Sequence, residues 1–173
     1  EILPIQEQSQ FMMSWYSKYM RDGVKSDIVI ILIGDSETTD ILLNSIYKPI
    51  FAKRKKYISV IDDDVLTKEP NNENLLNNKV LYHIDNLGAK TDKRRVKRLV
   101  RTIARPNFIN PIEAWNTDES YIYGNLLITS SKDTPFPYVE DIFSQCVVFR
   151  VRDIKTIQNK LNVDRNQLDQ LIE

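Results

Sequence analysis

Apolar residues along this chain follow two spacings, one typical of strands and one typical of helices. Short apolar runs of strand length lie at residues 28–33, 57–61, 79–85, 121–129 and 146–151. Helical spacing lies at residues 6–21, 41–47, 90–105, 138–145, 154–161 and 164–172. Because the strands alternate with helices, the pattern predicts an α/β layered domain with a largely parallel sheet of about five strands, flanked by helices and with short helices at both ends.

The first helical segment, 6–21, has a broad aromatic face. That face holds Phe11, Met12, Trp15, Tyr16 and Tyr19. Such a face most often packs on a core, but it could instead dock a partner protein. The exposure of Trp15 distinguishes the two, because a docking surface needs the indole to face solvent.

Composition narrows the class of protein without naming a partner. The 173 residues are 42% hydrophobic and 28% charged, with zero net charge, as in a globular domain. Cys146 is the single cysteine, so an internal disulfide is excluded and a reducing compartment is favoured: cytoplasmic, or host intracellular for a viral protein. No apolar run approaches the ~20 residues of a membrane span, so no membrane partner is expected.

The two ends of the chain bear on its predicted domain organisation. The chain starts without Met and ends inside a helical pattern, which predicts a piece of a longer protein. It would have a main domain at 1–153 and a helical appendage at 154–173.

His83 is the single histidine and lies mid-strand, so a core role is favoured over catalysis. Cys146 is interpreted as a small buried hydrophobe. We interpret Asp64, the last of three adjacent aspartates, as a helix cap, and we expect no metal site.

The segment after the first strand has the layout of a phosphate-binding loop. A buried strand, a turn and a helix N-terminus with the spacing G-x-x-x-x-G-K-[ST] would bind phosphate. Gly34 fits the first glycine, but Thr39, Asp40 and Ile41 stand where the second glycine, the lysine and the hydroxyl belong.

Acidic residues make this loop a poor anion site. Asp35, Glu37 and Asp40 bring three negative charges to the place where a triphosphate would lie, and like charges ~4 Å apart repel by about 1 kcal/mol in water. The alternative interpretation is an ordinary strand–turn–helix in which these acids cap the helix.

A second distinctive segment, 90–105, is strongly basic. Its apolar residues recur at helical spacing, which predicts an amphipathic helix with a basic outer face. That face could bind nucleic-acid phosphates, remain solvated, or meet an acidic subunit. The candidate phosphate contacts are Lys93, Arg94, Arg95, Lys97, Arg98 and Arg101.

The order of these segments resembles superfamily 3 helicases, the AAA+-type ATPases of viral, phage and mobile-element replication proteins. Residues 28–47 resemble the Walker A region, 80–86 the Walker B strand, and 126–131 the strand that ends in the sensor motif. Residues 135–137 and 147–149 resemble the proline turn and the last strand. The resemblance implies a P-loop NTPase (AAA+)-like fold, with DNA-contacting elements near the basic helix and the loop 107–118.

Each motif departs from the pattern in the same direction. Asp40 replaces the Walker A lysine, Asn86 replaces the second Walker B acid, and Ser131 replaces the sensor asparagine. Residues 144–146 lack the arginines that would reach a neighbouring nucleotide. Asp85 keeps the first Walker B acid, although a carboxylate at a strand end is equally a hydrogen-bond acceptor. The vestigial nucleotide site implied by the resemblance is Gly34, Ser36, Thr38, Thr39 and Asp40.

The sequence therefore predicts a helicase-like pseudo-ATPase module of a replication or mobile-element protein. It would bind DNA or assemble with other subunits or domains, with no cofactor and no hydrolysis, because phosphoryl transfer needs the metal, the lysine and a positioned water together. One alternative is an active helicase domain that binds ATP and Mg²⁺, with the missing charge supplied by Lys48, by Lys132 or by a partner subunit. Another is a protein–protein interaction module without a nucleic-acid role.

Overall fold

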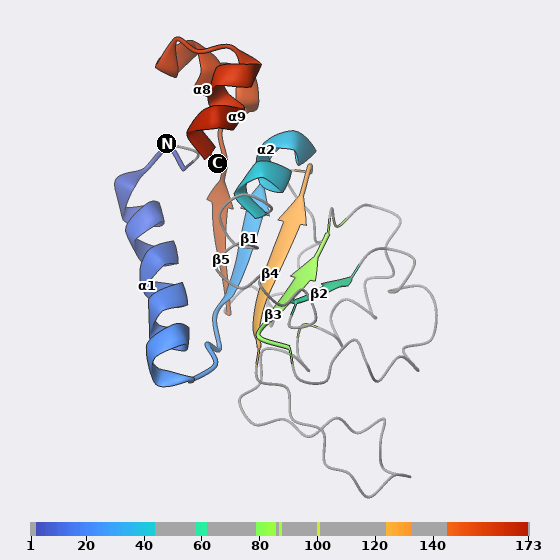
Figure 1. Cartoon of the computed structure of the whole chain (residues 1–173). Coiled ribbons are helices and arrows are strands. Elements are labelled where there is room, and N and C mark those ends of the chain that lie inside the picture. The colour runs from blue at the N-terminus through green and yellow to red at the C-terminus, as the bar shows by residue number, and fades with distance from the viewer. Residues whose placement is uncertain are drawn as a thin grey trace, which may run out of the picture.

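The computed structural model (Figure 1) describes residues 3–43, 58–61, 79–85, 87, 100, 124–132 and 145–172. Its elements in chain order are α1 (Gln6–Asp22), β1 (Val29–Ile33), α2 (Ser36–Ile41), β2 (Ile58–Ile61), β3 (Leu81–Ile84), β4 (Asn125–Ser130), β5 (Cys146–Arg150), α8 (Ile154–Leu161) and α9 (Arg165–Ile172). The strands predicted from the apolar runs all form, and the first and the last two helices fall within a residue of their predicted bounds.

The five strands form one parallel sheet in the order β2-β3-β4-β1-β5. The α/β architecture with a parallel sheet is thereby confirmed. β1 and β4 are buried along their whole length, which explains why β1 is an unbroken apolar run and why β4 has three consecutive apolar residues rather than an alternation. Because β4 lies between β1 and β3, the chain crosses over at this point in the sheet.

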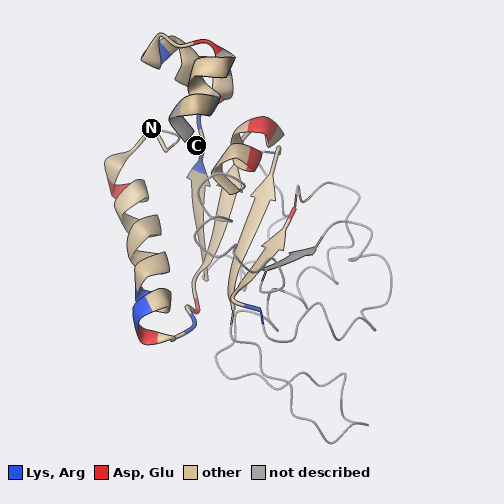
Figure 2. Cartoon of the chain, in the orientation of Figure 1, with Lys and Arg blue, Asp and Glu red and all other residues tan. Residues whose placement is uncertain are grey.

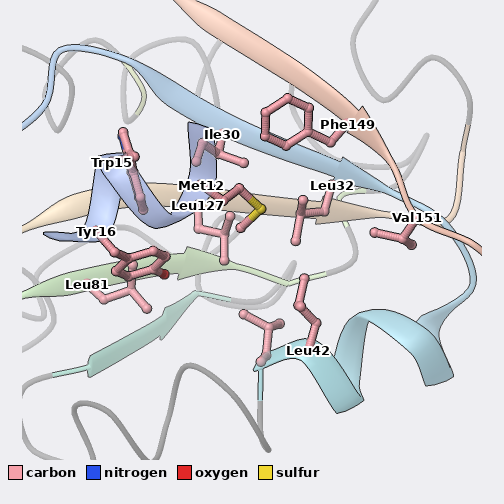
Figure 3. Close-up of a cluster of buried hydrophobic side chains, with 11 residues drawn as sticks. Met12, Trp15, Tyr16, Ile30, Leu32, Leu42, Leu81, Leu127, Phe149 and Val151 are labelled. Atoms are coloured by element: carbon pink, nitrogen blue, oxygen red, sulfur yellow. The ribbon is translucent and has the colours of Figure 1, made fainter. Parts of the chain in front are cut away.

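Helix α1 packs on one face of the sheet through the aromatic side predicted from its sequence (Figure 3). Met12, Trp15 and Tyr16 are buried against β1, β3, β4 and β5. The Trp15 indole N–H donates a 3.0 Å hydrogen bond to the Ile28 carbonyl, and the Phe11 ring meets the Phe149 ring edge-on at 5.8 Å. Trp15 is therefore part of the core and does not face solvent, so it does not provide the docking surface considered above.

The start of α2 differs from the prediction. The sequence pattern predicts a loop over 34–40 and a helix from Ile41, whereas the helix begins at Ser36. Asp35 is the physical reason, because its carboxylate accepts the Thr38 backbone N–H at 2.8 Å and so caps a helix that starts directly after the strand.

The C-terminal helices α8 and α9 lie beyond the carboxyl ends of β5 and β1, next to α2 (Figure 1). Ile154, Ile157 and Leu168 form a small cluster of buried residues against Ile41 and Val163. Asn162 ends α8 in the left-handed region at φ 53°, which allows the chain to turn sharply into α9. Whether 154–173 is a separate unit stays a prediction.

Several predicted features lie outside the described residues. They are the aspartates 62–64, the loop 107–118, the proline turn and helix of 135–144, and Lys48. Of the basic segment 90–105, the structure describes Val100, which is helical and fully buried. Val100 belongs to the apolar side that the pattern predicts for that helix.

Candidate functional site

Three segments that are far apart in the sequence meet at the carboxyl edge of the sheet. The β1 end reaches the β4 end where the Gly34 N–H donates to the Ser130 carbonyl at 3.0 Å. The β3 end reaches the same strand where the Leu87 N–H donates to the Thr129 carbonyl at 2.8 Å. These are the segments that resemble Walker A, Walker B and the sensor strand in sequence, and their juxtaposition is compatible with a P-loop-like fold without being specific to it.

The connection from β1 to α2 is only two residues long, Gly34 and Asp35. The Asp35 carboxylate accepts two hydrogen bonds from Thr38, one from the backbone N–H at 2.8 Å and one from the side-chain hydroxyl at 2.7 Å. The Thr38 N–H at the start of α2 therefore already has the Asp35 carboxylate as its hydrogen-bond acceptor. An anion at this position would compete with the Asp35 carboxylate for that donor.

The threonines of the predicted vestigial site point into the protein. Thr38 is fully buried, and the buried Thr39 hydroxyl bonds to the Asp35 carbonyl at 3.1 Å and the Ser36 carbonyl at 3.0 Å. Ser36 and Asp40 are exposed on α2. The five residues of the predicted site therefore lie between the end of β1 and the end of α2, and the Thr38 and Thr39 hydroxyls form hydrogen bonds within this segment.

Gly34 is required by close packing at this turn. A Cβ added at Gly34 would lie 2.1 Å from Cγ2 of Val151, the residue that follows β5. The Val151 N–H in turn donates to the Ile33 carbonyl at 2.8 Å, which fixes the two backbones together. The first glycine of the loop is thus explained by the approach of β5, without reference to a phosphate.

Asp85 is held at the same edge by a short polar chain. The Thr129 hydroxyl donates to Asp85 Oδ1 at 3.2 Å, and Thr129 Oγ1 lies 3.0 Å from His83 Nε2. His83 is buried within β3, and its Nε2 lies 3.8 Å from Asp85 Oδ1. The core role predicted for His83 is confirmed, and Asp85 is a strand-end acceptor whose side chain is 44% exposed.

The end of β4 is equally ordered by hydrogen bonds. The buried Ser130 hydroxyl donates to the Leu87 carbonyl at 2.8 Å and accepts the Lys132 backbone N–H at 3.1 Å. Ser131, at the sensor position, and Lys132 are exposed. Thr129 and Ser130 fall at the first two positions of the predicted sensor motif, but the sequence pattern assigned no role to either of them. A run of hydroxyl residues after an apolar strand was the available signal, but it does not reveal which neighbour each hydroxyl bonds.

Charge at the edge is predominantly acidic where α2 begins. Figure 2 shows acidic residues and no basic residue on α2, in agreement with its sequence of Glu37 and Asp40 without Lys or Arg. With Asp35, three carboxylates lie between the end of β1 and the end of α2. Within the part of the chain that the structure describes, no group of three or more His, Cys, Asp or Glu is arranged to hold a metal ion.

Two further groups have altered acidity because of burial. Burial raises the pKa of the Cys146 thiol to about 11, and it lowers the pKa of the Lys25 amine to about 8. Cys146 is half-buried at the start of β5. Among the described helices, none is long and apolar enough to cross a membrane.

Not all predicted site residues fall within the described part. Asn86 and the basic residues Lys93, Arg94, Arg95, Lys97, Arg98 and Arg101 lie outside it. Gly34, Ser36, Thr38, Thr39, Asp40, Asp85 and Ser131 lie inside it, at the carboxyl edge of the sheet.

Neither a protein-family model nor a curated protein matches this sequence. Solved structures do match: two of them are apo structures of the NrS-1 C-terminal region (305–718), which align at TM-scores of 0.62 and 0.64, each with 19% identity. They cover 87% and 93% of this chain. A third structure of that region aligns at a TM-score of 0.63 with 20% identity over 91% of this chain. The chain spans 34 to 41% of the length of these NrS-1 chains. At this level of identity, the likeness shows that the fold is shared.

Proposed function

We propose that this chain is a helicase-like module of a replication protein that has lost ATP hydrolysis and acts by binding DNA or assembling with other parts of its parent protein. The carboxyl edge of the sheet has the layout of a nucleotide site, but the residues at that edge lack the side chains that bind and hydrolyse a nucleotide.

The observation that carries the proposal is the start of α2 directly after β1. A phosphate-binding loop needs a run of free backbone N–H groups between strand and helix. Here Ser36–Ile41 is already helical, and Asp35 accepts the Thr38 N–H at 2.8 Å. The absence of a lysine on this helix removes the full positive charge that would hold a triphosphate.

The arrangement of the neighbouring strands supports the helicase-like part of the proposal. β4 lies between β1 and β3, so Gly34, Asp85 and Ser131 come to one edge, as the resemblance to superfamily 3 helicases requires. The structures of the NrS-1 C-terminal region share the fold, which is compatible with the module proposed here.

DNA binding is proposed for the basic segment 90–105. Eight Lys or Arg against one acid give this segment the charge density that phosphates attract, and each phosphate contact adds salt-dependent affinity. Val100 is buried, which is consistent with a helix that packs its apolar side inward and keeps its basic side outward.

One observation favours the alternative of retained ATP and Mg²⁺ binding. Asp85 is held at the edge by Thr129 and remains 44% exposed, so a carboxylate is still available where the Walker B acid would lie. A single carboxylate binds Mg²⁺ weakly unless substrate phosphates complete the coordination shell. For that reason we place this alternative second.

Fluorescence anisotropy with labelled single- and double-stranded DNA tests the DNA-binding proposal. The double variant Arg94→Glu, Arg98→Glu should weaken binding and flatten its dependence on salt, because two phosphate contacts are lost. The matched control is Lys155→Glu, Lys160→Glu on α8, which changes the net charge equally and should have a smaller effect. Equal loss in the two variants, or no loss in the first, would count against a dedicated basic face.

A further inference from the structure

The last two helices form a pair that is joined by a short turn. α8 and α9 each span eight residues, and residues 162–164 connect them. Asn162 ends α8 in the left-handed region, and its N–H donates to the Asn159 carbonyl at 3.3 Å. The Val163 N–H donates back to the Gln158 carbonyl at 3.1 Å. These two hydrogen bonds close the end of α8 and turn the chain sharply out of it.

The start of α9 is fixed just as locally. The Gln167 N–H donates to the Asp164 carboxylate at 2.8 Å, and the Asp164 N–H donates to the Gln167 side-chain oxygen at 2.9 Å. These reciprocal bonds form a capping box, which fixes where a helix begins. Ile157 of α8 and Leu168 of α9 belong to one buried cluster, against which Val163 of the turn packs. The turn and the shared cluster therefore hold α8 and α9 in one arrangement.

The outer face of α9 carries two carboxamide side chains. Leu168 is buried, whereas Asn166 and Gln170 are exposed. At 100° per residue, each of these two amides lies about 160° from Leu168, and they lie about 40° from each other, one turn apart. Asn166 and Gln170 are therefore neighbours on the side of α9 that faces away from the buried cluster.

A carboxamide is the side-chain group that matches adenine in the major groove of DNA. It offers both N–H donors and a carbonyl acceptor. Adenine presents its N7 acceptor and its N6 amino donor in that groove, so Asn or Gln can bind it through two hydrogen bonds. An α-helix with its side chains is about 10–12 Å across, and the major groove is about 12 Å wide, so the groove admits one helix. In a DNA-binding helix-turn-helix motif, the second helix occupies the groove, and its N-terminal residues contact the bases.

Figure 1 shows α8 and α9 at one end of the molecule, beyond the sheet, where Ile41 of α2 packs against the pair. From these observations we infer that α8 and α9 are a helix-turn-helix unit, which places Asn166 and Gln170 in the major groove of double-stranded DNA to read adenine. The inference rests on the proposed function for the attraction of phosphates, which is assigned there to the segment 90–105. It adds a preference for base sequence, because contacts to base edges specify a site whereas contacts to phosphates do not.

Selection of bound duplexes from a pool with a randomised central segment tests the inference. The full 173-residue chain should enrich a sequence with A·T pairs at fixed positions. The double variant Asn166→Ala, Gln170→Ala should lower the preference for that duplex over a scrambled one by about fivefold or more, because a bidentate contact to a base discriminates by at least that factor. Fluorescence anisotropy measures the two affinities. The salt dependence of binding should be unchanged, because no charge is removed.

A matched control removes the same two side-chain types elsewhere. Asn159→Ala, Gln10→Ala changes exposed positions of α8 and α1, outside the outer face of α9, and should keep the preference for the enriched duplex. Circular dichroism verifies that both double variants fold, which is expected because all four side chains are exposed.

A modified base tests the contact itself. 7-Deazaadenine lacks the N7 acceptor, so placing it in the enriched sequence should weaken binding of the unmodified chain and leave binding of Asn166→Ala, Gln170→Ala unchanged. Absence of an enriched sequence would overturn the inference, and so would a preference that survives Asn166→Ala, Gln170→Ala. Neither result bears on phosphate binding by the segment 90–105, which fails separately if Arg94→Glu, Arg98→Glu does not weaken DNA binding.

Discussion

The capping of α2 by Asp35 gives a prediction whose size follows from burial. Asp35→Ala removes the acceptor of the Thr38 N–H and also leaves the Thr38 hydroxyl without the carboxylate that it reaches at 2.7 Å. Loss of a helix cap costs about 1 kcal/mol, and an unsatisfied buried hydroxyl costs about 1–3 kcal/mol more. Because Thr38 is 0% exposed, water cannot replace the lost bond, so we expect a loss of about 2–4 kcal/mol in the free energy of unfolding.

The chain provides its own control for this prediction. Asp153 caps α8 with the same geometry, accepting the Thr156 N–H at 2.9 Å and the Thr156 hydroxyl at 2.6 Å, but Thr156 is exposed. Asp153→Ala should therefore destabilise the chain less than Asp35→Ala, because water can bond the freed hydroxyl. Urea unfolding of both variants, measured by circular dichroism, makes the comparison.

A double variant isolates the contribution of the buried hydroxyl. Thr38→Val keeps the side-chain shape and removes the group that needs a partner, so Asp35→Ala should cost less in a Thr38→Val background than alone. If Asp35→Ala is no more destabilising than Asp153→Ala, then burial of Thr38 does not set the cost and the reasoning is refuted.

Three further predictions concern other residues of the fold. Gly34→Ala should destabilise the chain by about 1–3 kcal/mol, because the new Cβ would collide with Val151 Cγ2. The double variant Gly34→Ala, Val151→Ala should recover part of this loss. A thermal melting midpoint of Gly34→Ala equal to that of the unmodified chain would contradict the prediction. Burial lowers the pKa of Lys25 to about 8, so the folded state binds fewer protons than the unfolded state between that pKa and the ordinary value of 10.5. Stability should accordingly rise with pH across this window, and the rise should be smaller in Lys25→Met when unfolding is followed from pH 7.5 to 10. Burial raises the pKa of the Cys146 thiol to about 11, so its reaction with a thiol reagent at pH 8 should be slower than that of free cysteine, and a rate equal to that of the urea-unfolded chain would refute the role of burial.

Much of the fold could be predicted because its signals are local. β1 and β4 are buried along their length, so their apolar runs stand out in the sequence, and the helical period of 6–21 identified α1 to within a residue. Asn162 and the capping residues Asp153 and Asp164 delimit the last two helices in the same local way.

The start of α2 could not be predicted with the same rules. The spacing after Gly34 suggested a phosphate loop, while the capping geometry of Asp35 depends on where Thr38 points in the folded chain. The acids were also open to a capping interpretation, and Asp35 fulfils it. The apolar spacing alone does not separate a loop from a capped helix at this place, because the Asp35 cap is a polar contact.

The polar chain of His83, Thr129 and Asp85 was inaccessible to sequence analysis for a different reason. Its members lie on two strands separated by more than forty residues, and only the pairing of β3 with β4 brings them within hydrogen-bond distance. The register of a parallel pair is fixed by the whole sheet, so the contact could not be derived from either strand alone.

Isothermal titration calorimetry with ATP and Mg²⁺ against the purified chain tests the central claim most directly. The claim is that Asp35, the early start of α2 and the missing lysine have removed the phosphate site. We predict no saturable heat up to millimolar ATP. Saturable binding with a micromolar Kd would contradict the claim and would show that this edge of the sheet still holds a nucleotide.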